Sequence, residues 1–152
     1  MKQRRLRIAS LVIAALGIAI ATYLTYVHYA GLQPICAGGS HGCERVQSSS
    51  YATVGGVPVA VLGLIGYVSI ATALLVPGEG ARLAAAALTV VGFGFSAYLT
   101  YLELFVIDAV CQWCVSSAVL LTVLVVLCIW RLLLVDEPPP GPAAEASSAA
   151  AG

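Results

Sequence analysis

The sequence predicts an all-α fold, an integral membrane bundle of four transmembrane helices with both termini in the cytoplasm. Hydrophobic residues make up 61% of the 152-residue chain and charged residues only 9%, a balance typical of membrane proteins. The apolar residues form four uncharged runs, each close to the roughly 20 residues that span a bilayer. Six of the seven basic residues fall on one side of these runs, which marks that side as cytoplasmic.

The elements follow in a simple order along the chain. A basic N-terminus precedes the first helix, an outer loop follows it, and three further helices lead to a Pro-, Ala- and Ser-rich tail that we expect to be disordered. The first helix could instead be a cleaved signal peptide, but its apolar run exceeds the about 7 to 15 residues of a signal core. The expected boundaries are 1–7 for the N-terminus, about 8–30, 57–76, 82–104 and 112–135 for the helices, 31–56 for the loop, 8–135 for the membrane domain and 136–152 for the tail.

Two cysteine pairs lie just outside the same end of the apolar segments. Cys36 and Cys43 belong to the outer loop, and Cys111 and Cys114 form a CxxC at the start of the last helix. A helix N-terminus favours the thiolate, which is the reactive form of cysteine. We expect Cys114 in the first helical turn at the membrane boundary and Cys111 nearer water, so that Cys111 exchanges disulfides while Cys114 faces an acceptor in the membrane.

The loop pair has alternative interpretations. Glycines between Cys36 and Cys43 give the backbone freedom, which suits a disulfide shuttle whose sulfurs must reach a target, but the pair could also be a plain structural disulfide. Four cysteines in two pairs could bind zinc, although only Cys111 and Cys114 have the tight spacing of a zinc knuckle. We therefore expect no metal site.

Three other polar or reactive residues receive ordinary structural interpretations. Cys128, deep in the last helix, is expected to be a small packing residue. Glu103 and Asp108 flank the short outer turn before the CxxC, and we expect both to be solvated charges at the membrane interface.

An ordered set of motifs resembles the vitamin K epoxide reductase (VKOR) family, in its bacterial branch, over roughly residues 8–135. The motifs are the loop cysteine pair, then Cys43-Glu-Arg-Val-Gln-Ser-Ser49-Ser-Tyr51, then Gly56-Val-Pro58-Val-Ala-Val-Leu-Gly63, and finally Cys111-Gln-Trp-Cys114. The resemblance implies a four-helix bundle around a quinone, with the CxxC as active site and the loop pair as relay. It also implies that Ser49 faces the quinone. Trp113, inside the CxxC, is either an interfacial aromatic residue or a lid over the quinone ring.

The function implied by the resemblance is that of a membrane thiol:quinone oxidoreductase. Such an enzyme generates disulfides in a thioredoxin-like, DsbA-like partner outside the membrane, reduces a lipid quinone (menaquinone, ubiquinone or a vitamin K-type quinone) and supports oxidative folding of exported proteins. We expect a multi-pass protein of the inner or plasma membrane, surrounded by lipid, with its active site on the periplasmic side and no role for nucleic acid.

The sequence departs from the family pattern in two respects. Animal members use an asparagine and a tyrosine to contact vitamin K, and Val59 and Ala118 stand at the matching positions, so those contacts are not carried over. Many bacterial members carry a fused thioredoxin-like domain, whereas here we expect the thiol partner to be a separate protein. The alternative from another class is a structural or assembly membrane protein with two outer disulfides.

Overall fold

The computed structural model describes residues 2–36 and 41–134. Its elements are helical apart from one antiparallel pair of two-residue strands, in which Thr53 pairs with Pro58. The all-α prediction is therefore confirmed. In chain order the elements are α1 (Lys2–Tyr29), α2 (Gly42–Gln47), the 3-10 turn η2 (Ser50–Ala52), β1 (Thr53–Val54), β2 (Val57–Pro58), α3 (Val59–Leu75), α4 (Glu79–Leu102), the π-helical turn η3 (Glu103–Ile107) and α5 (Gln112–Leu133).

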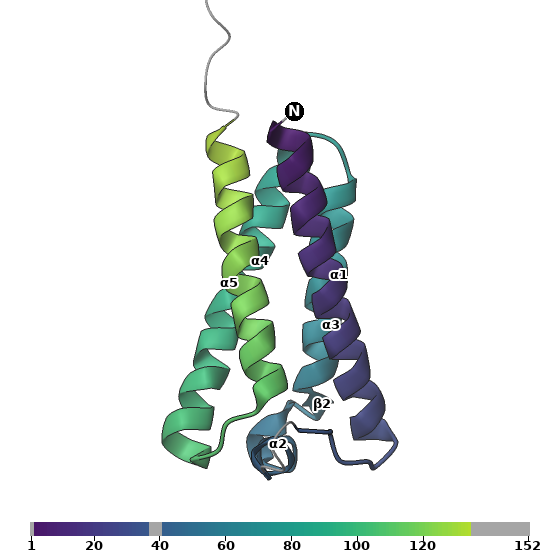
Figure 1. Ribbon diagram of the computed structural model, residues 1–152, viewed down its shortest axis with the longest axis vertical. Helices are drawn as coiled ribbons and strands as arrows, with labels where there is room; N and C mark the ends of the chain where they lie inside the picture. The colour runs from purple at the N-terminus through teal and green to yellow at the C-terminus, as the bar shows by residue number, and fades with distance from the viewer. Residues whose placement is uncertain (1, 37–40, 135–152) are drawn as a thin grey trace, which may run out of the picture.

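The four long helices pack as a closed ring in which α1 and α4 each lie against both α3 and α5. The N-terminus, the α3–α4 connection and the end of α5 gather at one end of the bundle, and α2, the strands and the η3–α5 connection lie at the other (Figure 1). All the paired cysteines are at this second end. The tail expected at 136–152 lies outside the described residues.

Helix lengths and surface composition suit a bilayer. Helix α1, the continuous segment of α4 and η3, and helix α5 are each long and apolar enough to cross a membrane, and α3 is a shorter apolar helix of 17 residues. Large apolar side chains cover the outside of the bundle, which is unusual for a protein that faces water. Among them are Val12, Leu16, Val91, Val119, Val126 and Ile129.

Close packing at the centre of the bundle depends on a small residue opposite a large one. A Cβ at Gly17 of α1 would collide with the ring of Tyr67 on α3. The Tyr67 hydroxyl donates a hydrogen bond to the backbone carbonyl of Ser117 at 3.1 Å and lies 2.9 Å from the Ser117 hydroxyl. Tyr67 therefore joins three helices. Cys128 is buried in the same core, as the sequence predicted.

The end of the bundle opposite the cysteines is held together by long basic and polar side chains. Arg7 of α1 donates hydrogen bonds to the carbonyls of Leu74 and Leu75, which end α3. Gln3 donates to the carbonyl of Arg131 on α5 at 3.1 Å. These contacts satisfy carbonyl groups that have no partner within their own helix.

Candidate active site

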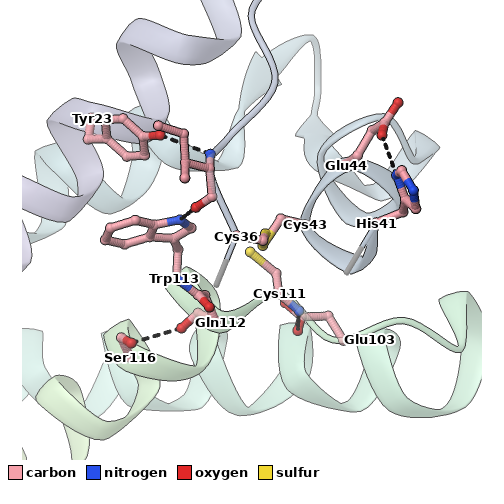
Figure 2. The surroundings of a disulfide bond; sticks show 11 residues. Tyr23, Cys36, His41, Cys43, Glu44, Glu103, Cys111, Gln112, Trp113 and Ser116 are labelled. Atoms are coloured by element: carbon pink, nitrogen blue, oxygen red, sulfur yellow. Dashed lines mark hydrogen bonds and ion pairs between the residues drawn. A yellow bond between two sulfur atoms is a disulfide. The ribbon is translucent and has the colours of Figure 1, made fainter. Parts of the chain in front are cut away.

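The two cysteine pairs meet at one end of the bundle. Cys36 and Cys43 form a disulfide with a Cα–Cα distance of 6.4 Å, and Cys111 packs in one buried cluster with Cys36 and Cys43. Figure 2 shows the Cys111 sulfur directed toward the disulfide. The loop pair is therefore placed to exchange electrons with the CxxC.

The chain before Cys36 is anchored to two helices of the bundle. The Trp113 indole N–H donates to the Ile35 carbonyl at 2.9 Å, and the Ile35 N–H donates to the Tyr23 hydroxyl at 3.0 Å. The rings of Tyr23 and Trp113 lie 5.0 Å apart (Figure 2). Trp113 thus holds the disulfide loop against α1 and α5, a role that the sequence did not suggest.

The short helix α2 seats Cys43 above the CxxC. Gly42 approaches the backbone carbonyl of Val110 so closely that a Cβ at this position would collide with it. On the outer side of α2, the Glu44 carboxylate accepts a hydrogen bond from Gln33 at 2.6 Å and lies 3.3 Å from the His41 ring. His41 therefore contacts a carboxylate at the surface of the protein and not a cysteine sulfur.

The CxxC begins helix α5 as expected: Cys111 is the residue before the helix and Cys114 lies in its first turn. Cys111 is nevertheless 0% exposed, whereas Cys114 is partly accessible and lines the cavity between the helices. The reason is that α2 and the loop disulfide cover Cys111 completely.

The environment of Cys111 favours its thiolate. The hydrogen bond from the Cys114 side chain is the main cause that lowers the pKa of Cys111, and the backbone N–H groups of Cys114 and Trp113 lower it further. Burial and the negative charge of Glu103 act in the opposite direction, but the pKa remains below that of an ordinary cysteine. Cys111 is therefore readily ionised in the reduced pair, and a thiolate is also the better leaving group when a disulfide to Cys111 is broken.

Glu103 is the functional candidate that the sequence analysis misjudged. It is 3% exposed, its carboxylate accepts the Cys111 backbone N–H at 3.1 Å, and it lines the same cavity as Cys114. The expectation of a solvated interface charge is thus wrong for Glu103, whereas Asp108 is exposed as expected. Its position in the sequence could have indicated this role. Glu103 stands at the end of an apolar span, where burying a carboxylate costs free energy and ionisable residues are usually functional.

A cavity of about 270 Å³ opens between the helices beside Cys114. Most of its wall is apolar, with side chains from all four long helices. Ser49, Trp113 and Cys114, the three residues expected at the quinone, all line it, and the Ser49 hydroxyl is tied to the Val46 carbonyl at 2.7 Å. The other polar residues of the wall include Tyr67, Glu103 and Ser117.

Metal binding was the other chemistry considered for these cysteines. Within residues 2–36 and 41–134, no three His, Cys, Asp or Glu side chains are grouped to hold a metal ion. Cys36 and Cys43 are joined to each other in this form of the protein.

Comparison with known protein families agrees with this geometry. The family model described as the vitamin K epoxide reductase family (VKOR) matches residues 8–129, which is most of the chain. The chain belongs to the VKOR family. VKOR proteins are membrane-embedded oxidoreductases that act on thiols and quinones and generally work with a thioredoxin-like partner.

The VKOR cavity fits a quinone. An aromatic dione needs apolar walls for its ring and hydrogen-bond donors for its carbonyl oxygens, and binding pockets usually combine these two features. Here most of the wall is apolar, and the polar side chains along it include Ser49, Ser117 and Cys114. The Ser49 hydroxyl donates to the Val46 carbonyl, so it would have to turn from that carbonyl to donate to a quinone oxygen. Val59 also lines the cavity, so an apolar side chain stands where animal VKOR proteins are expected to have an asparagine.

Proposed function

We propose that this VKOR protein is a thiol:quinone oxidoreductase that forms disulfides in a thioredoxin-like partner outside the membrane and reduces a lipid quinone within it. The observation that carries the proposal is the order of the sulfurs. Cys111 contacts the loop disulfide on one side and Cys114 on the other, and Cys114 lines the apolar cavity. Electrons therefore have a continuous route from the outer loop to the membrane interior.

The loop disulfide is the entry point for the partner. Cys36 is partly exposed whereas Cys43 is 1% exposed, so the thiolate of a reduced partner attacks Cys36 and releases the Cys43 thiol. Cys43 lies in the buried cluster with Cys111 and is placed to pass electrons to the CxxC. Each exchange breaks one S–S bond and forms another, so no electrons are lost between the pairs.

Side chains of this protein line the place where a quinone would accept the electrons. A quinone, when bound, accepts two electrons and two protons. Ser49 and Ser117 are the side chains that would hold its oxygens, and Trp113 and the apolar wall would exclude water from its ring. The Cys111 thiolate is placed to close the disulfide with Cys114 as the pair is oxidised.

The proposed topology has four spans, both termini in the cytoplasm and the cysteines outside, in the inner or plasma membrane. Helix α3, with its 17 residues, rises about 26 Å, slightly less than a hydrocarbon core of roughly 30 Å. The end of the bundle that carries the N-terminus also carries Arg82 and Arg131, while Arg45 alone is at the cysteine end. This asymmetry supports the orientation by the positive-inside rule.

The test is quinone reduction by the purified protein in detergent, with a reduced dithiol protein as electron donor. We expect the native chain to reduce at least one of menaquinone, ubiquinone and a vitamin K-type quinone. Cys114→Ala should lower turnover to the uncatalysed rate because the sulfur beside the cavity is lost. Cys128→Ala is the matched control, since it removes a buried thiol that is not among the residues lining the cavity and should leave turnover unchanged.

The contrary result is equally clear. A folded native protein that reduces none of these quinones, and whose loop disulfide does not exchange with the reduced partner, would be a structural membrane protein with a fixed outer disulfide.

A further inference from the structure

The cavity beside the CxxC contains an acid with no cation to balance it. Among the described residues that line the cavity, Glu103 supplies the only carboxylate and Cys114 the only thiol. In residues 2–36 and 41–134, the ion pair that the structure contains joins His41 to Glu44, and no Lys or Arg pairs with Glu103. The Glu103 carboxylate accepts the Cys111 N–H at 3.1 Å and lines the same cavity as the Cys114 thiol.

Such a position is costly for a carboxylate. Removing a charge from water without a compensating partner costs several kcal/mol or forces the group to take up a proton. Ionisable groups retained inside a membrane bundle are usually functional for this reason. Glu103 is 3% exposed and lines the cavity together with Cys114, whose thiol interacts with the carboxylate.

The oxidation of a dithiol requires that two protons leave. Cys111 loses its proton readily because its surroundings favour the thiolate, and the Cys114 thiol supplies the main hydrogen bond that does so. The proton of Cys114 is consequently the one that needs an acceptor. The Cys111 thiolate cannot serve as this acceptor, because a proton passed to it would stay on the cysteine pair. Among the described residues that line the cavity, the remaining base is the Glu103 carboxylate, which interacts with Cys114.

We propose that Glu103 is the base that removes the proton from Cys114 when the CxxC is oxidised, a role that rests on the proposed thiol:quinone function. In this step the S–H bond of Cys114 breaks, an O–H bond forms on Glu103, and the electron pair stays on sulfur. Formation of the Cys111–Cys114 bond then releases two electrons to the quinone. The quinone's two protons correspond to those lost by Cys111 and Cys114, the second by way of Glu103.

Among the described residues that line the cavity, no second carboxylate and no imidazole or amine competes with Glu103 as a base, and the other titratable oxygens are the phenols of Tyr51 and Tyr67. On α3, the Tyr67 hydroxyl is engaged with Ser117. On α2, Cys43 is held in the disulfide and does not titrate, and the residues of α1 that line the cavity are apolar. Asp108, which follows η3, is exposed.

A purely structural role makes a different prediction. Glu103 also accepts the Cys111 N–H at the start of α5, and a glutamine at this position could accept the same bond. Glu103→Gln therefore keeps the structural contact and removes only the ability to take a proton. Glu103→Asp keeps a base on a shorter side chain, and Asp108→Asn removes a nearby exposed charge at a left-handed position that asparagine tolerates.

The first measurement needs no quinone. The full-length protein with Cys111→Ala is reduced, and alkylation of Cys114 by iodoacetamide is followed by mass spectrometry from pH 5 to 10. We expect Glu103→Gln to shift the midpoint for Cys114 to lower pH, because the negative charge that opposes its thiolate is gone. Asp108→Asn should leave the midpoint where it is.

The second measurement is turnover with quinone and a reduced dithiol protein in the chain with all cysteines intact. General-base catalysis contributes about a hundredfold or more, so Glu103→Gln should slow turnover by that factor, with a rate that rises with pH. Native protein should instead lose activity at low pH, where Glu103 is protonated, and Glu103→Asp should recover part of the rate.

The outcomes separate the two proposals. A native protein without turnover rejects the thiol:quinone function, whereas the alkylation midpoint still reports on the contact between Glu103 and Cys114. The role of Glu103 is overturned if Glu103→Gln retains native turnover, or if its turnover falls while the alkylation midpoint and the pH profile stay native. If Glu103→Gln does not fold, Glu103→Asp decides: a native rate and profile from a displaced carboxylate would overturn the role.

Discussion

At the scale of single residues, Cys111 is the sulfur on which the proposed chemistry turns. It is fully buried, it contacts the loop disulfide, and Cys114 stabilises its thiolate. Burial alone would make a thiol inert, so the hydrogen bond from Cys114 outweighs burial at this site. The reactivity of Cys111 is therefore expected to depend on the presence of its neighbour.

This dependence can be measured from the pH profile of alkylation. Because the pKa of Cys111 is lowered, its thiolate should persist below the usual value of about 8.5. Alkylation of Cys111 in the reduced protein should thus reach its half-maximal rate at lower pH than a free thiol does. Cys114→Ala removes the largest cause of the shift and should move the midpoint to higher pH, and Cys128→Ala should not. A native midpoint at or above that of a free thiol would contradict this assignment.

At the scale of elements, the local sequence was informative about helices and cysteine spacing. The apolar runs predicted the long helices, and Cys111 and Cys114 lie at the start of α5 as expected. Helix α1 begins at Lys2, earlier than the expected residue 8, because Lys and Arg continue a helix well. The basic residues mark the start of the apolar run, but the helix begins at the first of them.

The docking of the loop was not predictable in this way. Helix α2, the π-helical turn η3 and the burial of Glu103 depend on contacts between residues far apart in the chain. Trp113 reaches Ile35, and Gly42 approaches Val110. The residue spacing within one segment does not reveal which distant segment packs against it. For this reason Glu103 was predicted to be a solvated charge.

The contact of α2 with the segment before the CxxC leads to a prediction for Gly42. In Gly42→Ala the added Cβ collides with the Val110 carbonyl, so α2 must move away from Cys111. Overpacking of this kind costs about 1 to 3 kcal/mol, which corresponds to a roughly 5- to 150-fold lower population of the docked arrangement. We expect fewer mixed disulfides between the loop and Cys111 to be trapped in a Cys114→Ser background.

The control for this experiment is Gly80→Ala. Gly80 lies in α4 at the opposite end of the bundle, and a Cβ there meets nothing. Its yield of trapped mixed disulfide should equal that of the parent chain. Equal yields from Gly42→Ala would show that α2 does not position the loop pair.

At the scale of the whole molecule, the two ends of the bundle carry different kinds of residues. The two cysteine pairs, Glu103 and the anchored loop occupy one end, and most basic residues occupy the other. By the positive-inside rule, this difference predicts that the two ends face different compartments. The composition predicted a membrane bundle. The structure adds that the two cysteine pairs and Glu103 lie together at one end of it.

The orientation can be tested with single cysteines at the two ends. In a chain whose five native cysteines are replaced by serine, Leu32→Cys and Glu79→Cys each place one thiol on an exposed position at opposite ends. A membrane-impermeant maleimide should label Leu32→Cys in intact bacteria and Glu79→Cys only after lysis. Labelling of Glu79→Cys in intact cells would reverse the proposed orientation.

The complete burial of Cys111 has a consequence for the choice of electron donor. While the Cys36–Cys43 disulfide is closed, a small thiol or oxidant finds no exposed surface of Cys111 and meets the loop disulfide first. In the proposed function, every electron that reaches the quinone would therefore pass through the loop cysteines. The specificity of the route for its thiol partner would then be decided at Cys36, the partly exposed sulfur.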